Sequence, residues 1–372
     1  MPARNRPALI TLVAGARPNF MKIAPIARAL DRRSSGLHYQ ILHTGQHYDE
    51  AMNAVFWREL GIPAPTAFLE RGGGTHAQQT ARIMVGFEDY CVAAKPDMVI
   101  VVGDVDSTAA CAITAKKLKL TLAHVEAGLR SGDRGMPEEI NRLVTDSISD
   151  WFFVTEKQGV ENLLREGHDS QRVHHVGHVM IDNLLYQKAR LDAGDGVALS
   201  TSPLKASLGR YGVVTLHRPS NVDDRDTFAR ILSALSALAR ELPLVFPMHP
   251  RTRSRMETFG LAAGTGVHQL PPLPYMDFLN LWKDAAVILT DSGGIQEEAT
   301  ALGVSCLTLR ENTERPITIE EGTNVLVGTD PARIIAEAQN VIRGGGRTGR
   351  CPALWDGHAA DRIVETLNEI FA

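Results

Sequence analysis

The sequence is poor in cysteine, nearly balanced in charge and free of long apolar runs, and each absence excludes a class of protein. Its 372 residues include four cysteines, Cys91, Cys111, Cys306 and Cys351, with no C-x-x-C spacing. A disulfide framework or a zinc site needs closer clustering. We therefore expect four buried thiols in a reducing compartment and no bound metal.

The charge balance disfavours a nucleic-acid partner. Lys and Arg number 39 and Asp and Glu number 43, which gives a formal net charge of −4. A broad phosphate-binding surface carries excess positive charge, so any polyanionic ligand must be bound at a local site. No apolar run approaches the roughly 18 residues that span a bilayer, and residues 1–7 contain no signal-peptide core. We expect a cytoplasmic protein without a membrane partner.

The length and the hydrophobic pattern predict two α/β domains. At roughly 150 residues per domain, two domains of about 180 residues fit best. Short apolar runs alternate with helical patterns almost throughout, which is typical of βαβ units around a parallel sheet. The runs are 8–13, 38–43, 97–102, 121–125, 151–154, 173–176, 212–216, 242–248, 285–290, 304–309 and 324–327. The continuous run Met98–Val102 suits a strand buried on both faces.

Two interruptions divide this alternation. Between about Arg190 and Arg210 the segments 193–196 and 200–203 interrupt the periodicity, and three glycines at 344–346 precede a last amphipathic helix at about 357–370. The pattern predicts an α/β fold of two similar lobes with a cleft between them. The expected lobes are 1–190 and 205–355, and residues 356–372 follow as a separate C-terminal helix.

The clearest candidate for a ligand site is Leu289–Glu298, which leads from a buried strand through small residues into a helix. Ser292 is a good N-cap residue, and Gly293 and Gly294 let backbone amides approach a ligand at the positive end of the helix. This arrangement favours a phosphate site in which Glu298 binds a ribose diol. A plain serine-capped helix with a glycine turn fits the pattern equally well.

Cationic side chains follow several other strands. Arg17 and Lys22 begin the first helix, and the turn before it lacks G-x-G-x-x-G, which disfavours a dinucleotide cofactor. His217 and His249 end neighbouring strands of the second half, and Arg315 follows a later one. All could contact an anionic ligand. Solvated helix-start charges, satisfied histidines and a salt-bridged loop are the structural alternatives.

Acidic side chains follow the strands of the first half. Asp104 and Asp106 follow the strand 97–102, Glu126 follows the next strand and Glu138 begins a helix. Asp106 also suits a helix N-cap, whereas a carboxylate directly after a buried strand needs a partner or a function. Several carboxylates around one cleft suit proton transfer at a carbon centre, because crowding and burial raise a carboxyl pKa.

Taken together, these segments resemble the non-hydrolysing UDP-N-acetylglucosamine 2-epimerases over almost the whole chain. The segments that carry the resemblance are Gly15–Lys22, Thr44–His47, Gly103–Asp104, His124–Arg130, Pro137–Arg142, Leu216–Arg218, Thr290–Glu298 and Thr313–Pro316. The resemblance implies a fold like that of the B-type glycosyltransferases, with two Rossmann-like lobes, a central cleft and a final helix, residues 356–372, that packs back on the first lobe. It also implies a homodimer that interconverts UDP-GlcNAc and UDP-ManNAc without a cofactor, by eliminating UDP to a 2-acetamidoglucal and adding it back.

The resemblance also assigns roles by position. The residues that would hold the pyrophosphate are Arg17, Lys22, Ser292, Gly293, Gly294 and Arg315, and Glu298 would hold the ribose. Those near carbon 2 of the sugar would be Asp104, Glu126 and Glu138, with His217 near the leaving phosphate and Gln46 and His47 in a regulatory UDP-GlcNAc site. A hydrolysing epimerase, an epimerase of UDP-diacetamido-uronic acids, a UDP-sugar glycosyltransferase and a non-catalytic sensor are the alternatives.

Overall fold

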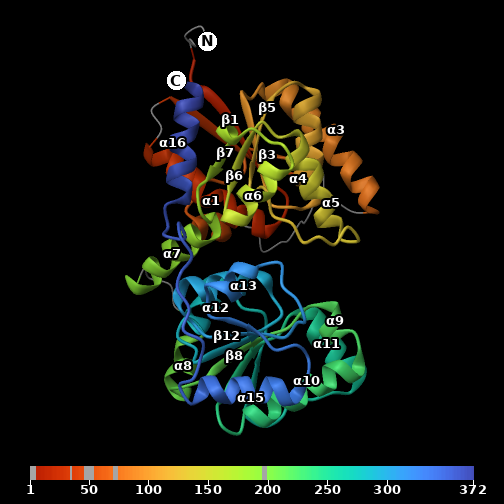
Figure 1. The fold of residues 1–372 in the computed structure, drawn as a ribbon, viewed down its shortest axis with the longest axis vertical. Coiled ribbons are helices and arrows are strands. Elements are labelled where there is room, and N and C mark those ends of the chain that lie inside the picture. The colour runs from red at the N-terminus through yellow and green to blue at the C-terminus, as the bar shows by residue number, and fades with distance from the viewer. Residues whose placement is uncertain (1–5, 34–35, 46–53, 70–73, 195–198) are drawn as a thin grey trace. The chain divides into compact units, whose positions relative to one another are not determined.

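A computed structural model describes residues 6–33, 36–45, 54–69, 74–194 and 199–372 of the chain. The chain forms two compact units (Figure 1). Unit 1 contains residues 1–186 and 353–372, and unit 2 contains residues 187–352. Each unit is built around a parallel β-sheet, so the expected class of two α/β lobes is confirmed.

In the described residues, unit 1 has a seven-stranded parallel sheet of order β3-β2-β1-β4-β5-β6-β7. The strands are β1 Ala8–Ala14, β2 Leu37–His43, β3 Ala67–Phe68, β4 Met98–Val102, β5 Thr121–Val125, β6 Trp151–Val154 and β7 Val173–His175. Every residue of β4 is buried, as expected for a central strand covered on both faces. The strand order reverses between β1 and β4, which makes that edge the topological switch point of the sheet.

The helices of unit 1 connect these strands and cover the sheet. They are α1 Arg17–Arg33, α2 Ala54–Leu60, α3 His76–Ala94, α4 Asp106–Lys117, α5 Pro137–Ile148, α6 Lys157–Arg165, the single 3₁₀ turn η1 Ser170–Arg172, and α16 Ala359–Phe371. Helix α4 is rich in Ala, Ser and Thr, and it packs against both α3 and α5. Small side chains allow this close approach, so α4 and α5 place their first turns beside the ends of β4 and β5.

Unit 2 repeats the arrangement with six strands among its described residues, in the order β10-β9-β8-β11-β12-β13. The strands are β8 Gly212–Thr215, β9 Leu244–Pro247, β10 Val267–Leu270, β11 Val287–Thr290, β12 Cys306–Thr308 and β13 Asn324–Leu326. The helices are α8 Ser202–Leu208, α9 Pro219–Val222, α10 Arg225–Leu238, α11 Pro250–Phe259, α12 Tyr275–Trp282, α13 Gly293–Leu302, α14 Pro316–Glu320 and α15 Pro331–Ile342. Its switch point lies between β8 and β11.

Helix α7 (Val179–Asp192) leads from unit 1 into unit 2, and the C-terminal helix α16 returns to unit 1 and packs beside α1 (Figure 1). The buried Asp182 of α7 accepts hydrogen bonds from the backbone N–H groups of Ala359 and Ala360, at 3.2 and 2.7 Å. This carboxylate therefore satisfies two of the four N–H groups that begin α16 without a helical partner. The C-terminal helix is joined to unit 1 through a cap supplied by another helix.

One cysteine departs from the expected burial. Cys91, Cys111 and Cys306 are buried, but Cys351 is exposed. Cys351 lies in the irregular stretch between α15 and α16. In the part of the chain that the structure describes, no helix is both long and apolar enough to cross a membrane.

Candidate functional site

The predicted site residues flank the switch points of the two sheets. In unit 1, Arg17 follows β1 and Asp104 follows β4, and these two strands are neighbours. In unit 2, His217 follows β8 and Ser292 follows β11, which are neighbours as well. Ligands of open parallel sheets bind at the carboxyl ends of strands beside such a reversal. Each unit therefore presents one candidate half-site.

In unit 1, Lys22 and Glu126 form a close ion pair. The Lys22 ammonium lies 2.5 Å from Glu126 Oε2, and the two side chains are only 13 % and 3 % exposed. Glu126 has a positive φ of 66°, an unusual conformation for a residue that is not glycine. A methyl group built on Gly103 would lie 2.8 Å from Lys22 Nζ and 3.8 Å from Glu126 Oε2. The turn after β4 thus passes directly over the ion pair.

The adjacent Asp104 is held by an arginine from α5. Arg142 donates from Nε and Nη2 to Asp104 Oδ2, at 3.1 and 2.6 Å. Its Nη1 donates to the buried Glu139, which also accepts from the backbone of Ser131 and Gly132. Burial alone would raise the pKa of Glu139, but these hydrogen bonds and the Arg142 guanidinium lower it. Glu139 is therefore a fixed anion that positions Arg142 and, through it, Asp104.

Glu138 is exposed in the first turn of α5. Asp106 is the first residue of α4, and Val105 takes the N-cap position, so the N-cap alternative for Asp106 is wrong by one residue. Asp106 instead accepts from Asn141 and pairs with His76, at 3.1 and 2.7 Å. Its carboxylate raises the pKa of His76 above the ordinary value, with a smaller contribution from Glu138.

In unit 2, a fully buried carboxylate positions His217. Asp291 accepts from the backbone N–H groups of His217 and Arg218 and from Asn221 Nδ2, at 2.9–3.2 Å. Its Oδ1 also lies 3.0 Å from His217 Nδ1, and the His217 ring is 39 % exposed. The contact assigns the Nδ1 proton to the Asp291 side and leaves Nε2 for a ligand. The second expected histidine, His249, lies 5.8 Å away between ring centroids.

The start of α13 is open. Ser292 is the N-cap residue, as expected, but its side chain makes no capping hydrogen bond. A methyl group built on Gly294 would meet nothing within 4 Å, and one on Gly293 would only touch Glu314 Oε2 at 4.0 Å. Neither glycine has a positive φ. Packing and backbone conformation therefore do not require glycine here, whereas a ligand bound to the first N–H groups of the helix would.

The remaining predicted residues of unit 2 border this helix start. Glu298 is buried on α13 and accepts from the Tyr275 hydroxyl at 3.0 Å. Arg315 Nε lies 2.7 Å from the buried Glu297, so the salt-bridged loop is present in this structure. Beside them, burial would raise the pKa of Glu314, but Arg310 lowers it to about 2. Anion-binding cations are thus close to the helix start, but already bound to carboxylates.

One further prediction concerns unit 1. Gln46 and His47, the expected regulatory residues, lie outside the described residues.

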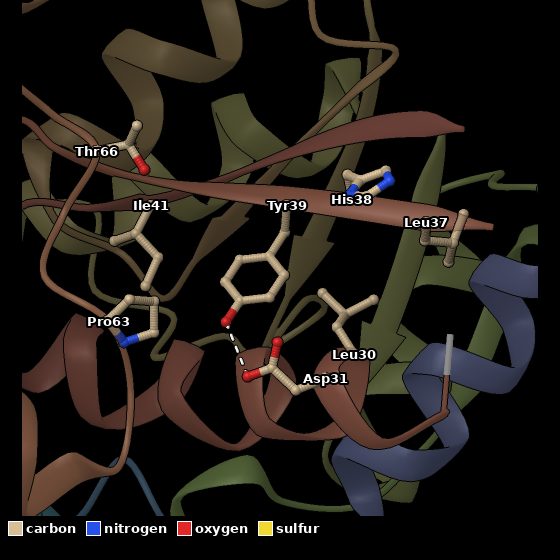
Figure 2. A pocket seen from close by; sticks show the side chains of 8 residues that line it. All are labelled: Leu30, Asp31, Leu37, His38, Tyr39, Ile41, Pro63 and Thr66. Atoms are coloured by element: carbon tan, nitrogen blue, oxygen red, sulfur yellow. Dashed lines mark hydrogen bonds between the residues drawn. The ribbon is translucent and has the colours of Figure 1, made fainter. Parts of the chain in front are cut away.

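Unit 1 also contains a cavity that no prediction concerned. It measures about 410 Å³ and lies between the end of α1 and β2 (Figure 2). The Tyr39 hydroxyl donates to Asp31 Oδ2 across it at 3.0 Å, and burial together with this carboxylate raises the pKa of Tyr39. None of the lining residues is a predicted site residue.

Comparison with known proteins shows the family of this chain. The model of the family "UDP-N-acetylglucosamine 2-epimerase" matches residues 28–368. A protein of that name from Methanocaldococcus jannaschii is 38 % identical over 364 residues, which cover 96 % of this chain and 98 % of the relative. This chain belongs to the UDP-N-acetylglucosamine 2-epimerase family. The family expected from the sequence segments is confirmed.

Members of this epimerase family differ in substrate and have been seen with ligands. A UDP-2,3-diacetamido-2,3-dideoxy-D-glucuronate 2-epimerase of Pseudomonas aeruginosa is also 38 % identical, over 97 % of this chain and 99 % of its own length. The crystal structure of the Methanocaldococcus jannaschii UDP-GlcNAc 2-epimerase, in complex with UDP-GlcNAc and UDP, matches with a TM-score of 0.85. That match covers 97 % of this chain and 99 % of the other.

Several residues that organise the half-sites lie inside the recognised segments but received no role from the sequence. Arg142 and Asp291 hold Asp104 and His217. On α13, the buried Gln296 accepts from Thr313 and Asn324, which anchors the loop that carries Arg315. The sequence contains a signal for Asp291, since a carboxylate directly after a buried strand needs a partner or a function. It contains no such signal for Gln296, whose partners are distant in sequence.

Proposed function

We propose that the protein interconverts UDP-GlcNAc and UDP-ManNAc by the non-hydrolysing route. A base removes the proton from carbon 2 of the sugar, the C2–H electron pair forms the C1–C2 double bond, and the bond from carbon 1 to the UDP oxygen breaks. The products are a neutral 2-acetamidoglucal and UDP. Addition of UDP to carbon 1 with protonation of carbon 2 on the opposite face completes the epimerisation.

The open start of α13 is the observation that carries the proposal for UDP. Gly293 and Gly294 leave the first N–H groups of the 10-residue helix α13 accessible, and such groups bind phosphate well. Arg315 and Lys22 would contribute cations, after release from Glu297 and Glu126 or while still paired with them. Because UDP is the leaving group, the interactions that stabilise its new negative charge lower the barrier to elimination.

His217 would protonate or hydrogen-bond the departing phosphate oxygen. Asp291 accepts the Nδ1 proton, so Nε2 is the nitrogen that faces a ligand. The protonated ring is the form that can donate a proton to the departing oxygen. In the reverse direction the neutral ring would take this proton back from UDP.

The carboxylates of unit 1 would handle the proton at carbon 2. Asp104, Glu126 and Glu138 remain the three candidates for the base and for the acid on the opposite face. Glu139 is not a candidate, since both of its oxygens already accept hydrogen bonds from Ser131, Gly132 and Arg142. Carboxylates of different burial in one site suit this chemistry, because one can be a base while another holds a proton.

A second substrate has specific support. The Pseudomonas aeruginosa relative that acts on a UDP-diacetamido-uronate is as similar as the Methanocaldococcus jannaschii epimerase, at 38 % identity. Both reactions invert carbon 2, so the residues described above serve either one. We retain epimerisation of a UDP-diacetamido-uronic acid as the second candidate.

The products of turnover distinguish these functions. The protein is incubated separately with UDP-GlcNAc and with the diacetamido-uronate, and the products are followed by proton and phosphorus NMR. The proposal predicts an equilibrium of UDP-GlcNAc and UDP-ManNAc. Free ManNAc with UDP would indicate a hydrolysing enzyme, turnover of the uronate alone would select the second candidate, and transfer only to an added acceptor would indicate a glycosyltransferase.

We further propose a cytoplasmic homodimer that supplies UDP-ManNAc for cell-surface polysaccharide.

A further inference from the structure

A fully buried histidine lies beneath the half-site of unit 1. His124, in β5, is 0 % exposed, and both of its ring nitrogens are engaged. Nδ1 lies 2.6 Å from Asp146 Oδ1, and Nε2 lies 2.9 Å from the carbonyl oxygen of Gly103. Gly103 directly precedes Asp104, and His124 lies two residues before Glu126. The ring therefore bridges the turns that carry both carboxylates.

The hydrogen bonds fix the orientation of this ring. A backbone carbonyl can only accept, so Nε2 carries a proton. Asp146 is buried, and its Oδ1 holds the ring through Nδ1. The ring is therefore held from both sides, by a carboxylate at Nδ1 and by the Gly103 carbonyl at Nε2.

The same network reaches the second turn of the half-site. Asp146 Oδ2 accepts from the backbone N–H of Gly128 at 3.0 Å and lies 2.7 Å from Arg130 Nη1. The N–H of Gly103 donates to the carbonyl oxygen of Val125 at 3.0 Å. The buried pair of His124 and Asp146 therefore ties the turn after β4 to the turn after β5.

A buried polar pair is a weak way to stabilise a fold. Removing polar groups from water is costly, and an apolar pair of similar volume is often at least as stable. The specific result of this pair is the position of the Gly103 carbonyl. Gly103 has a φ of 66°, and its Cα faces the ion pair of Lys22 and Glu126. A shift of the turn would move Asp104 relative to Glu126.

We infer that His124 is a positioning residue for the proton-transfer step. Its Nε2–H holds the Gly103 carbonyl and thereby sets the distance between Asp104 and Glu126, while Asp146 holds the ring through Nδ1. The inference rests on the proposed epimerase function, and it adds a residue that touches no substrate.

Two substitutions separate the two nitrogens. Asparagine places its amide N–H near the position of Nδ1, whereas glutamine places it near that of Nε2. His124→Gln keeps the donor to Gly103 and should retain kcat within about 10-fold. His124→Asn keeps the contact to Asp146, loses the Gly103 contact and should lower kcat by about 100-fold with KM nearly unchanged, since a misplaced catalytic group affects chemistry rather than binding. Equal kcat values for the two variants, or a larger loss for His124→Gln, would overturn the inference.

A second measurement does not depend on activity or on the folding of a variant. In 15N NMR of the wild-type protein labelled at histidine, Nε2 of the His124 ring should carry a proton, and the signal is assigned by through-bond connection to the His124 backbone. An Nε2 without a proton would refute the inference. A wild-type protein that turns over no UDP-sugar would instead refute the proposed function, whatever the NMR result.

Discussion

The two units share one topology and differ in the residues that follow their strands. At the switch point of unit 1, the buried Asn19 accepts from the backbone N–H groups of Gly15 and Ala16 and donates to the carbonyl of Val102, which joins β1 to β4. At the switch point of unit 2, Asp291 makes the equivalent link between β11 and β8.

The link in unit 1 is neutral, whereas the link in unit 2 is a buried negative charge. Asp291 therefore orients His217 through Nδ1, while Lys22 and the carboxylates supply the charges beside Asn19. Under the proposed function, this scaffold would place acid and base chemistry in unit 1 and the anionic leaving group in unit 2. The predictions below test this division.

The largest effect is expected for Glu126→Gln in unit 1. The amide cannot act as a base, so kcat should fall by about 1,000-fold or more, while the Kd for UDP changes little, because most of the proposed UDP contacts come from unit 2. Steady-state kinetics and calorimetry with UDP measure the two quantities. Asp89→Asn, at an exposed position of α3, is the matched control and should behave as wild type. A parallel loss of UDP affinity in Glu126→Gln would break the division.

The next effect concerns stability and belongs to unit 1 alone. Burial raises the pKa of Asp182 to about 6, from an ordinary value of 3.8. The folded protein therefore holds this proton more tightly than the unfolded chain, and the stabilisation is complete below about pH 4 and lost as pH rises through about 6. Relative to Asp182→Asn, wild-type stability should fall by about 2 kcal/mol between pH 4 and pH 7.

Urea unfolding of both proteins across this pH range measures the difference. Hydrogen exchange, corrected for its intrinsic pH dependence, should place the change in α16, whose N-terminus Asp182 caps, and not in α15 of unit 2. A stability difference that stays constant with pH would show that Asp182 does not titrate in this window.

The third effect sharpens the account of unit 2. Arg315→Ala should weaken UDP binding by about 10- to 100-fold, the range for loss of a charged hydrogen bond. Glu297→Gln is the control, because it removes the ion pair and keeps the guanidinium. Calorimetry with UDP should therefore show affinity close to wild type for Glu297→Gln. Unchanged affinity in Arg315→Ala would leave Arg315 with a structural role only.

The smallest effect separates a ligand requirement from a backbone requirement. Gly294→Ala should stabilise the fold by about 0.5 kcal/mol, since its φ is not positive and the space is open, yet weaken UDP binding about 10-fold. Gly303, the C-cap of the same helix, has a φ of 72°. Gly303→Ala should cost about 1 kcal/mol and leave UDP affinity unchanged. Thermal unfolding and calorimetry on both variants measure the two effects. If Gly294 serves packing alone, Gly294→Ala will lower the stability of the fold and leave the UDP affinity unchanged.

The sequence was sufficient for the fold class and for the segments that flank the switch points. Met98–Val102 reads as a strand covered on both faces, and all of its residues are buried. The small residues at 292–294 predict the start of a helix, and α13 begins there. These features depend on local pattern, which propensity and periodicity report directly.

The pairing of the site residues was beyond the sequence. Lys22 and Glu126 are 104 positions apart, and His217 and Asp291 are 74 apart, so their contacts depend on strand order and register. The same is true of the capping at Ser292, where the residue is right but the side chain leaves the helix start open. Such details require coordinates, because several rotamers and partners satisfy the same local pattern.

The central claim is that carbon 2 of the bound sugar exchanges its proton with groups of this protein while UDP departs and returns. Incubation with UDP-GlcNAc in D2O tests it most directly. The account predicts UDP-ManNAc and recovered UDP-GlcNAc that both carry deuterium at carbon 2, as seen by loss of the carbon 2 proton signal. UDP-ManNAc formed with its original proton retained at carbon 2, or no change in the sugar at all, would contradict it.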